Sequence, residues 1–174
     1  IDGDEFFFWL SDQAPAMVDR RSDAVSEAIA RCVVFKADVV AQDKTESRGV
    51  RECLNYGHTL AHAIEKLSGY GTYSHGHAVA EGMRFAARMG MRLADMPAEL
   101  AQAQAQLLDD LGLPELDWEA SPAQVLETMK RDKKARHGQV RFVCLHDVGQ
   151  WQLRDVADDV ILEELEAYFA QKRR

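Results

Sequence analysis

The sequence predicts a mainly α fold, a multihelical domain with one small β-hairpin near its C-terminus. Hydrophobic residues recur at +3/+4 spacing through most of the chain, glycine and proline separate stretches of helical length, and the convincing strand pattern falls within residues 139–156. With 174 residues, 47% of them hydrophobic, the chain is long enough to bury one core. We therefore expect residues 1–174 to form a single domain.

Two helices are predicted at the start of the chain. Residues 5–10 form a short aromatic-rich helix, with Asp4 as its N-cap and Pro15 helping to end it. Residues 22–42 form a longer helix, because their hydrophobic side chains follow helical periodicity. This hydrophobic stripe consists of Val25, Ile29, Cys32 and Val39 or Val40.

The middle of the chain predicts three further helices. Residues 50–68 return to helical periodicity after a polar loop, and Gly69 supplies a C-terminal stop. A long helix rich in small residues covers 75–96 and ends at Pro97, and another covers 98–111.

The last third of the chain predicts a helix, a hairpin and a final helix. Pro122 opens the first of these at a position where proline is favoured. Residues 139–145 and 150–156 flank a short polar turn, which indicates two paired strands. A closing amphipathic helix begins at Asp158, and the cationic residues 172–174 suit its C-terminus.

Composition limits the possible partners. The 29 acidic and 21 basic residues give a net charge of −8, so the surface should repel nucleic acid and anionic membranes. No hydrophobic run approaches the roughly 20 residues that span a bilayer. Cys32, Cys53 and Cys144 show no CxxC spacing and lie in hydrophobic stretches, as expected of reduced core residues. We expect a cytoplasmic protein without nucleic-acid or membrane partners.

Polar side chains line one face of the helix predicted over residues 50–68. They follow +4, +3, +4 and +3 steps and fall within an arc of about 80° at 100° per residue. The members of this line are Arg51, Asn55, His58, His62 and Glu65. Two histidines at i and i+4 can reach one metal ion or one ligand, although such spacing also occurs on solvated or hydrogen-bonded faces.

A third imidazole follows on the next helix. His75 lies beyond a short glycine-containing turn that can fold it back toward His58. His77 is about 160° around the helix from His75 and aligns with Glu81 and Arg84, so we interpret His77 as facing the surface. We expect His58 and His75 to approach each other closely and His77 to point away.

Two cationic features have alternative interpretations. Lys36 lies on the hydrophobic face of the helix at 22–42, where a lysine either extends to the surface, the more common case, or lines an anion pocket. Basic residues between 130 and 136 either complement a helix dipole or form a phosphate or carboxylate subsite.

Several motifs together resemble the signature of 3-dehydroquinate synthases. Residues 51–65 read RECLNYGHTLAHAIE, and residues 75–83 read HGHAVAEGM. Upstream, KADVVAQD at 36–43 is similar to a third family motif, and downstream DKK at 132–134 and GQVRFV at 138–143 are similar to two more. Their order and approximate spacing agree with the family over most of the chain. The resemblance identifies the chain as the C-terminal, metal-binding and substrate domain of such an enzyme.

The resemblance implies a function and a set of site residues. His58 and His75 correspond to ligands of Zn²⁺ or Co²⁺. The residues implied in substrate binding and catalysis are Lys36, Arg51, Asn55 and His62, joined by Lys133 or Lys134 in substrate binding. The implied reaction converts 3-deoxy-D-arabino-heptulosonate 7-phosphate to 3-dehydroquinate and phosphate, in the shikimate pathway of aromatic amino acid biosynthesis. Bound NAD transiently oxidises a substrate alcohol in this reaction.

The resemblance also implies that part of the enzyme lies outside this sequence. In the family, an N-terminal domain carries the nucleotide-binding fold, a glutamate as third metal ligand and further site residues. No glycine-rich phosphate-binding fingerprint occurs within the 174 residues. We therefore expect this chain to be one domain of a longer, homodimeric synthase. The N-terminal domain of that synthase would hold NAD, so we expect the 174-residue chain to be inactive by itself.

Three other functions compete with this one. A related sugar-phosphate cyclase, of the 2-epi-5-epi-valiolone or 2-deoxy-scyllo-inosose synthase type, would share the fold, although the DKK segment favours the shikimate-pathway enzyme. An iron-type alcohol dehydrogenase would carry proline where this chain has Ala63. A catalytically silent helical interaction module is the alternative outside enzymes.

Overall fold

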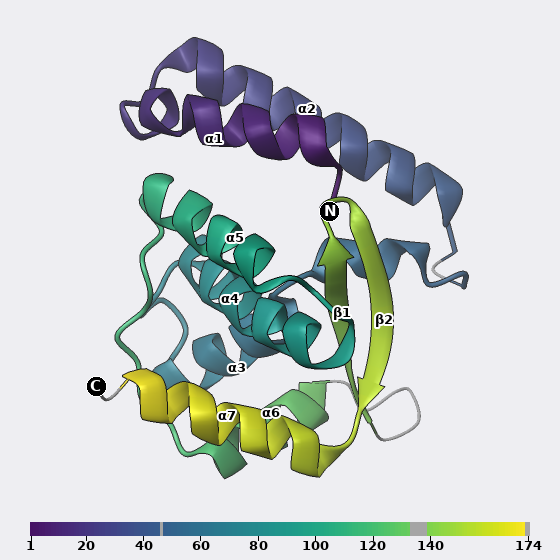
Figure 1. Cartoon of the computed structure of the whole chain (residues 1–174), viewed down its shortest axis with the longest axis vertical. Helices are drawn as coiled ribbons and strands as arrows, with labels where there is room; N and C mark the ends of the chain where they lie inside the picture. The colour runs from purple at the N-terminus through teal and green to yellow at the C-terminus, as the bar shows by residue number, and fades with distance from the viewer. Residues whose placement is uncertain (46, 133–138, 173–174) are drawn as a thin grey trace.

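The mainly α architecture with one hairpin is confirmed (Figure 1). The computed structural model describes residues 1–45, 47–132 and 139–172, and these contain seven α-helices, one 3-10 helix and one antiparallel two-stranded sheet. The elements are α1 (Asp4–Val18), α2 (Ser22–Gln42), the 3-10 helix η1 (Val50–Asn55), α3 (His58–Ser68), α4 (His75–Leu93), α5 (Ala98–Asp110), α6 (Pro122–Asp132), β1 (Val140–Asp147), β2 (Gln150–Val156) and α7 (Asp158–Lys172).

Helices α1 and α2 form a pair that crosses one end of the molecule next to α5 (Figure 1). The prediction that a first helix ends near Pro15 was wrong, because α1 continues through it to Val18. Ala14 is completely buried where α1 packs, and this packing outweighs the lost backbone hydrogen bond. The predicted bounds of α2 are confirmed.

Most of the hydrophobic stripe predicted for α2 does not lie in the core. Of the α2 residues, Ala24 and Val39 are buried, whereas Ile29 is 59% exposed and Cys32 is also exposed. Two further hydrophobic side chains, Val33 and Val34, are 61% and 60% exposed. We call Ile29, Val33 and Val34 the α2 ridge. Periodicity predicted the helix correctly but could not show which element, if any, covers its hydrophobic face.

The main core lies between α3, α4, α6, α7 and β1. Phe85 of α4, Phe142 of β1 and Ile161 of α7 are almost completely buried in it. These three side chains bring together segments that are far apart in the sequence. Burial of each such large hydrophobic side chain contributes about 1.5 to 3 kcal/mol to the free energy of folding. The histidine-bearing helices α3 and α4 therefore belong to the best-packed part of the domain.

A break separates η1 from α3, and it overturns the prediction of one helix over residues 50–68. Gly57 has φ +82°, a left-handed conformation that glycine adopts without strain. A Cβ on Gly57 would lie 2.8 Å from the backbone oxygen of Val79, and a Cβ on Gly82 would lie 1.9 Å from the oxygen of Gly57. The chain therefore bends at Gly57 because α4 passes there in direct backbone contact.

The hairpin is joined to η1 by an ion-pair network. Val140 pairs with Val156 and Arg141 with Asp155 in the antiparallel register. The Arg141 guanidinium donates to both carboxylate oxygens of Asp155, at 2.6 and 2.9 Å, and to Glu52 Oε1 at 3.2 Å. Glu52 belongs to η1, so this arginine fixes the 3-10 helix against the sheet.

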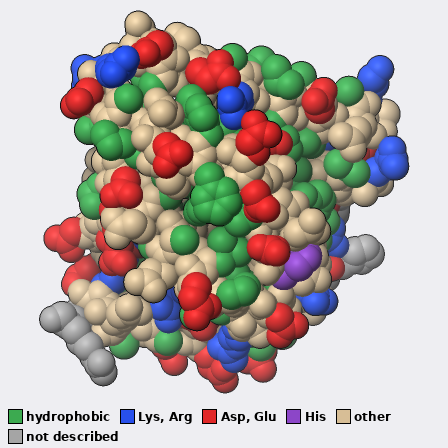
Figure 2. Space-filling view, turned by 45° about the horizontal axis from the view of Figure 1, so that its top comes forward, with side chains coloured by type: hydrophobic (Ala, Val, Ile, Leu, Met, Phe, Trp, Pro, Cys, Tyr) green, Lys and Arg blue, Asp and Glu red, His purple; other side chains and the backbone are tan. Residues whose placement is uncertain are grey.

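Acidic side chains are prominent on the surface (Figure 2), in agreement with the net charge. Figure 2 shows acidic side chains spread over one face, with hydrophobic and basic side chains between them. Within residues 1–45, 47–132 and 139–172, none of the helices has the length and hydrophobicity that a bilayer-spanning segment needs.

Candidate functional site

Three histidines come together where α3 and α4 begin. His58 is the first residue of α3, His62 lies one turn further, and His75 is the first residue of α4. Their ring centroids are 5.3 Å apart for His58 and His75, 5.7 Å for His58 and His62, and 6.5 Å for His62 and His75. The predicted approach of His58 and His75 is confirmed.

Two of these rings are oriented by hydrogen bonds through Nδ1. His58 Nδ1 lies 3.3 Å from the backbone oxygen of Tyr56, and His75 Nδ1 lies 2.9 Å from Glu65 Oε1. When each Nδ1 carries the proton and donates it, each Nε2 has the lone pair that a metal ion requires. A carboxylate or carbonyl behind the imidazole is the usual support of a metal-binding histidine.

Burial keeps His58 in its neutral form. Desolvation is the main effect that lowers the pKa of His58 below its ordinary value, and the neighbouring His62 and His75 rings lower it further. The Tyr56 carbonyl and Glu65 act in the opposite direction, but they do not compensate. A neutral imidazole is the form that binds metals, so no proton has to be displaced near neutral pH.

The ring separations distinguish a pair within the histidine cluster. Two imidazoles on one tetrahedral zinc, with Zn–N bonds of about 2.0 to 2.1 Å, have ring centroids about 5 Å apart. The 5.3 Å between His58 and His75 fits this value best, the 5.7 Å between His58 and His62 is longer, and the 6.5 Å between His62 and His75 is too long. No group of three or more potential ligands suited to a metal ion occurs in the described part of the chain. The described residues thus bring two imidazoles, those of His58 and His75, to a separation that a shared ion would require, and their role as ligands stays a prediction.

His77 lies apart from this pair. Its Nδ1 is 2.6 Å from Ser74 Oγ, the residue that caps α4. The expectation that His75 rather than His77 lies beside His58 is confirmed. His77 itself is half-buried, and the residues with which it aligns are covered, because Glu81 is 1% and Arg84 8% exposed. Helices α5 and α7 cover this face of α4, which periodicity alone cannot reveal.

Three other predicted site residues occupy two elements, α2 and η1. Lys36 is exposed on α2, Arg51 is half-buried in η1, and Asn55 is exposed at the end of η1. Since η1 is a 3-10 helix and is separated from α3 by the bend at Gly57, the α-helical line that grouped Arg51 and Asn55 with the histidines does not exist. Helix α2 packs against η1, which brings their elements together. A common cleft for these side chains stays a prediction.

Two further predicted residues, Lys133 and Lys134, lie outside the described residues. Sequence reasoning also missed how Glu65 acts. It was recognised as part of a polar line, yet its hydrogen bond to His75 depends on the turn between α3 and α4. The spacing of ten residues between Glu65 and His75 gave no signal of this contact.

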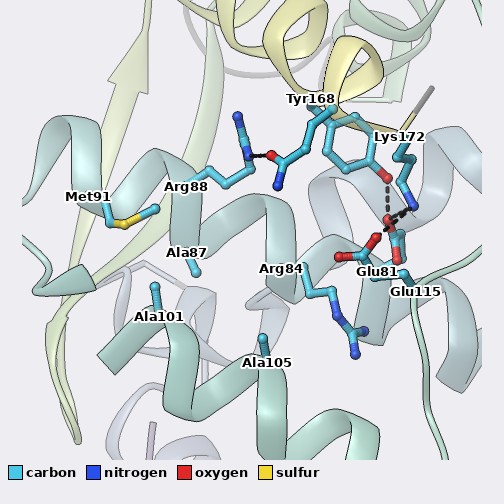
Figure 3. Close-up of a pocket in the computed structure, with 11 residues that line it drawn as sticks. Glu81, Arg84, Ala87, Arg88, Met91, Ala101, Ala105, Glu115, Tyr168 and Lys172 are labelled. Atoms are coloured by element: carbon cyan, nitrogen blue, oxygen red, sulfur yellow. Dashed lines mark hydrogen bonds and ion pairs between the residues drawn. The ribbon is translucent and has the colours of Figure 1, made fainter. Parts of the chain in front are cut away.

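A cavity of about 160 Å³ lies between α4, α5 and α7, away from the three histidines (Figure 3). Its cationic side chains are paired: Arg88 donates to Gln171 Oε1 at 2.7 Å, and Lys172 Nζ lies 2.8 Å from Glu81 Oε1. Tyr168 also donates to Glu81. These contacts fasten α7 onto α4, so the cavity lies within a structural network.

Comparison with known proteins gives one family and several similar enzymes. Residues 1–135 match the family described as 3-dehydroquinate synthase C-terminal. The 3-dehydroquinate synthase of Neisseria meningitidis serogroup B is 38% identical over 164 residues, which are 94% of this chain and 45% of the relative. That of Rhodopirellula baltica is 41% identical over 150 residues, 86% of this chain and 40% of the relative. The chain thus spans less than half the length of these relatives.

Two solved structures resemble the fold. A 2-deoxy-scyllo-inosose synthase complexed with carbaglucose-6-phosphate, NAD⁺ and Co²⁺ is 26% identical, with a TM-score of 0.71 over 83% of this chain and 41% of that one. A 2-epi-5-epi-valiolone synthase from Streptomyces hygroscopicus, with NAD⁺ and Zn²⁺ bound, has a TM-score of 0.81 at 16% identity, over 97% of this chain and 47% of that one. At 16% identity the second match concerns the fold alone.

Proposed function

Because the chain belongs to the 3-dehydroquinate synthase C-terminal family, we propose that it forms the metal-binding and substrate half of a 3-dehydroquinate synthase. The reaction is conversion of 3-deoxy-D-arabino-heptulosonate 7-phosphate to 3-dehydroquinate and phosphate, in the cytoplasmic shikimate pathway. The observation that carries this proposal is the pair of His58 and His75, with rings 5.3 Å apart and each Nδ1 supported by an acceptor.

In the proposal, His58 and His75 hold one divalent ion, Zn²⁺ or Co²⁺, through their Nε2 atoms. Such an ion, when bound, polarises substrate oxygens and lowers the pKa of a coordinated hydroxyl. Catalytic zinc usually has three protein ligands and an open position, so a further ligand comes from outside the described residues. Glu65 keeps His75 in the binding orientation and increases the basicity of its ring.

The anionic substrate is bound by the cationic and polar residues around this pair. The Arg51 guanidinium can donate two parallel hydrogen bonds to a phosphate or carboxylate, and the Lys36 ammonium supplies a second positive charge. Asn55 and His62 supply polar contacts to hydroxyl groups, since His62 lies too far from His75 to share its ion. Lys133 or Lys134 completes the anion site.

The remainder of the synthase supplies the nucleotide site. The chain covers 45% of the Neisseria meningitidis relative and contains no glycine-rich nucleotide fingerprint, so we assign NAD binding mainly to an N-terminal domain. The exposed α2 ridge is on the helix that carries Lys36, and hydrophobic side chains exposed in this way mark a contact surface. We propose that the N-terminal domain covers this ridge, within a homodimer of the full-length enzyme.

The isolated chain is expected to bind metal weakly and to show no synthase activity. The reason is that the redox cofactor must be held against the substrate, and a pair of histidines leaves a loose metal site. The test measures phosphate release from the heptulosonate phosphate, with NAD and Zn²⁺ or Co²⁺, for the chain alone and with an N-terminal domain added in trans. Phosphate release by the chain alone, at a rate near that of the mixture, would place the active-site boundary elsewhere.

The same assay distinguishes the competing functions. The similarity to a 2-deoxy-scyllo-inosose synthase favours a related cyclase as second candidate. Glucose 6-phosphate, the sugar that carbaglucose-6-phosphate mimics, is therefore offered in parallel with the heptulosonate phosphate. Turnover of glucose 6-phosphate without turnover of the heptulosonate phosphate would favour the second candidate. An inactive mixture of correctly folded halves would instead favour a silent interaction module.

Replacing Glu65 with alanine in the full-length synthase is expected to weaken metal binding roughly 10- to 100-fold, the usual cost of removing a carboxylate behind a histidine ligand. A chelator competition with Zn²⁺ measures this change. The matched control is Glu127→Ala, which removes an exposed glutamate paired with Arg131 on α6. Equal zinc affinity of the Glu65 and Glu127 variants would refute the supporting role of Glu65.

A further inference from the structure

Asp43 is a buried charged residue whose carboxylate is held by backbone N–H groups. It is 2% exposed and follows the last residue of α2. Its Oδ1 accepts the backbone N–H groups of Ser47 at 3.0 Å and Arg48 at 3.1 Å, and its Oδ2 accepts those of Val50 at 3.1 Å and Arg51 at 3.4 Å. The Asp43 side chain thus accepts four backbone N–H groups, two from the loop after α2 and two from the start of η1.

These amides keep the Asp43 carboxylate ionised. Burial alone would raise the pKa of Asp43, but the four backbone hydrogen bonds hold it below its ordinary value. An asparagine at this position would place the NH₂ group of its side chain opposite backbone N–H groups, so that donors would face donors. The site therefore requires a side chain with two terminal oxygen acceptors, which a carboxylate provides and an amide does not.

The loop geometry shows what this carboxylate connects. Gly49 has φ +76°, so the chain turns back just before Val50, and the amides of Val50 and Arg51 face Asp43. Arg48 Nη1 also donates to the Gln42 backbone oxygen at 3.1 Å, which closes the end of α2. Asp43 consequently joins the end of the helix that carries Lys36 to the start of η1.

Helix η1 is held on its other side as well. Arg141 of β1 donates to Glu52, the residue after Arg51, and pairs with Asp155 of β2. The backbone of Arg51 therefore lies between two charged anchors, one on α2 and one on the hairpin. Such fixation limits the positions that the Arg51 side chain can reach, and a misplacement of about 1 Å is enough to impair binding or catalysis.

We propose that Asp43 is a positioning residue, which sets the Arg51 guanidinium for the anionic group of the substrate by fixing the backbone of η1 relative to α2. This inference rests on the proposed function. Asp43 contacts backbone amides, so it acts through Arg51 and does not touch the substrate. Asp43 is the last residue of the KADVVAQD motif at 36–43, in which the family resemblance implies a role for Lys36 but none for Asp43.

The test compares wild-type full-length synthase with Asp43→Asn, in the presence of Zn²⁺ and NAD. Loss of one well-placed contact to a charged group weakens binding about 10- to 100-fold. We expect the KM for the heptulosonate phosphate and the inhibition constant of inorganic phosphate to rise by at least about tenfold. The KM for NAD, the zinc content and kcat are expected to change much less.

A double-mutant cycle shows whether Asp43 acts through Arg51. In an Arg51→Ala background, Asp43→Asn should cause little further rise in KM, because the positioned group is already absent. The matched control is Asp110→Asn at the end of α5, where the carboxylate accepts one bond from the Gln106 side chain. Asp110→Asn should leave every parameter unchanged.

Each outcome separates this inference from the proposed function. An inactive wild-type synthase would refute the proposed function itself. An active wild type, with Asp43→Asn lowering the active fraction or kcat at unchanged KM, would show a purely structural role. If Asp43→Asn does not fold, Gly49→Ala loosens the same turn through its positive φ, and unchanged KM in that variant would overturn the inference.

Discussion

Replacing His75 with alanine in the full-length synthase is expected to lower kcat/KM at least about a thousandfold, because a catalytic metal contributes several kcal/mol of transition-state stabilisation. His58→Ala should have the same effect. The proposed site draws one ligand from α3 and one from α4, with ring centroids 5.3 Å apart, so either change removes one of the two proposed histidine ligands. The purified variants should also contain substantially less zinc or cobalt, measured by elemental analysis.

His77→Ala is the matched control for this prediction. His77 is two residues from His75 on α4, and its ring bonds to Ser74 rather than to the cluster. Its removal should leave metal content intact and activity within about twofold, since the loss of a partly exposed hydrogen bond is small. Full activity and full metal content in His75→Ala would rule out His75 as a ligand.

The second large effect is expected for Gly82→Ala, which should lower the free energy of unfolding by about 3 kcal/mol or more. The new Cβ would lie 1.9 Å from the oxygen and 2.8 Å from the carbonyl carbon of Gly57. Both are backbone atoms, so no flexible side chain can give way. Helices α3 and α4 would have to separate, and the histidine pair would separate with them.

Denaturant unfolding, followed by circular dichroism, measures this loss for the chain and for the full-length enzyme. Gly76→Ala provides the control, because it makes the same change on the same helix at a position where a Cβ meets no atom within 4 Å. It should be neutral or stabilise by up to about 1 kcal/mol. A Gly82→Ala variant as stable as Gly76→Ala would mean that the close contact of the two backbones is not required.

Local signals predicted those parts of the fold that local forces decide. The bounds of α2 and the pairing of the hairpin follow from periodicity and turn residues, and both are confirmed. The bend at Gly57 was missed because its cause is α4, which passes there 25 residues later in the sequence. The continuation of α1 through Pro15 was also missed because its cause is a tertiary contact. Ala14 is buried where α1 packs against other helices.

The candidate site shows the same limit. The approach of His75 to His58 could be predicted, because a short turn brings a helix start back beside its predecessor. The grouping of Arg51 with the histidines by helical angle was wrong, because the angle assumed a continuous helix. The burial of Glu81 and Arg84 depends on α5 and α7, and a periodic pattern contains no information about such covering elements.

The glycine contact between α3 and α4 has a consequence for how this domain can diverge. His58 directly follows Gly57, and the helix that starts at His75 meets Gly57 through Gly82. At this point the two backbones touch directly, so the distance between α3 and α4 is set there by backbone atoms. Any side chain added at position 57 or 82 would push these helices apart, so divergence at both glycines is restricted by packing, independently of the chemistry of the histidines.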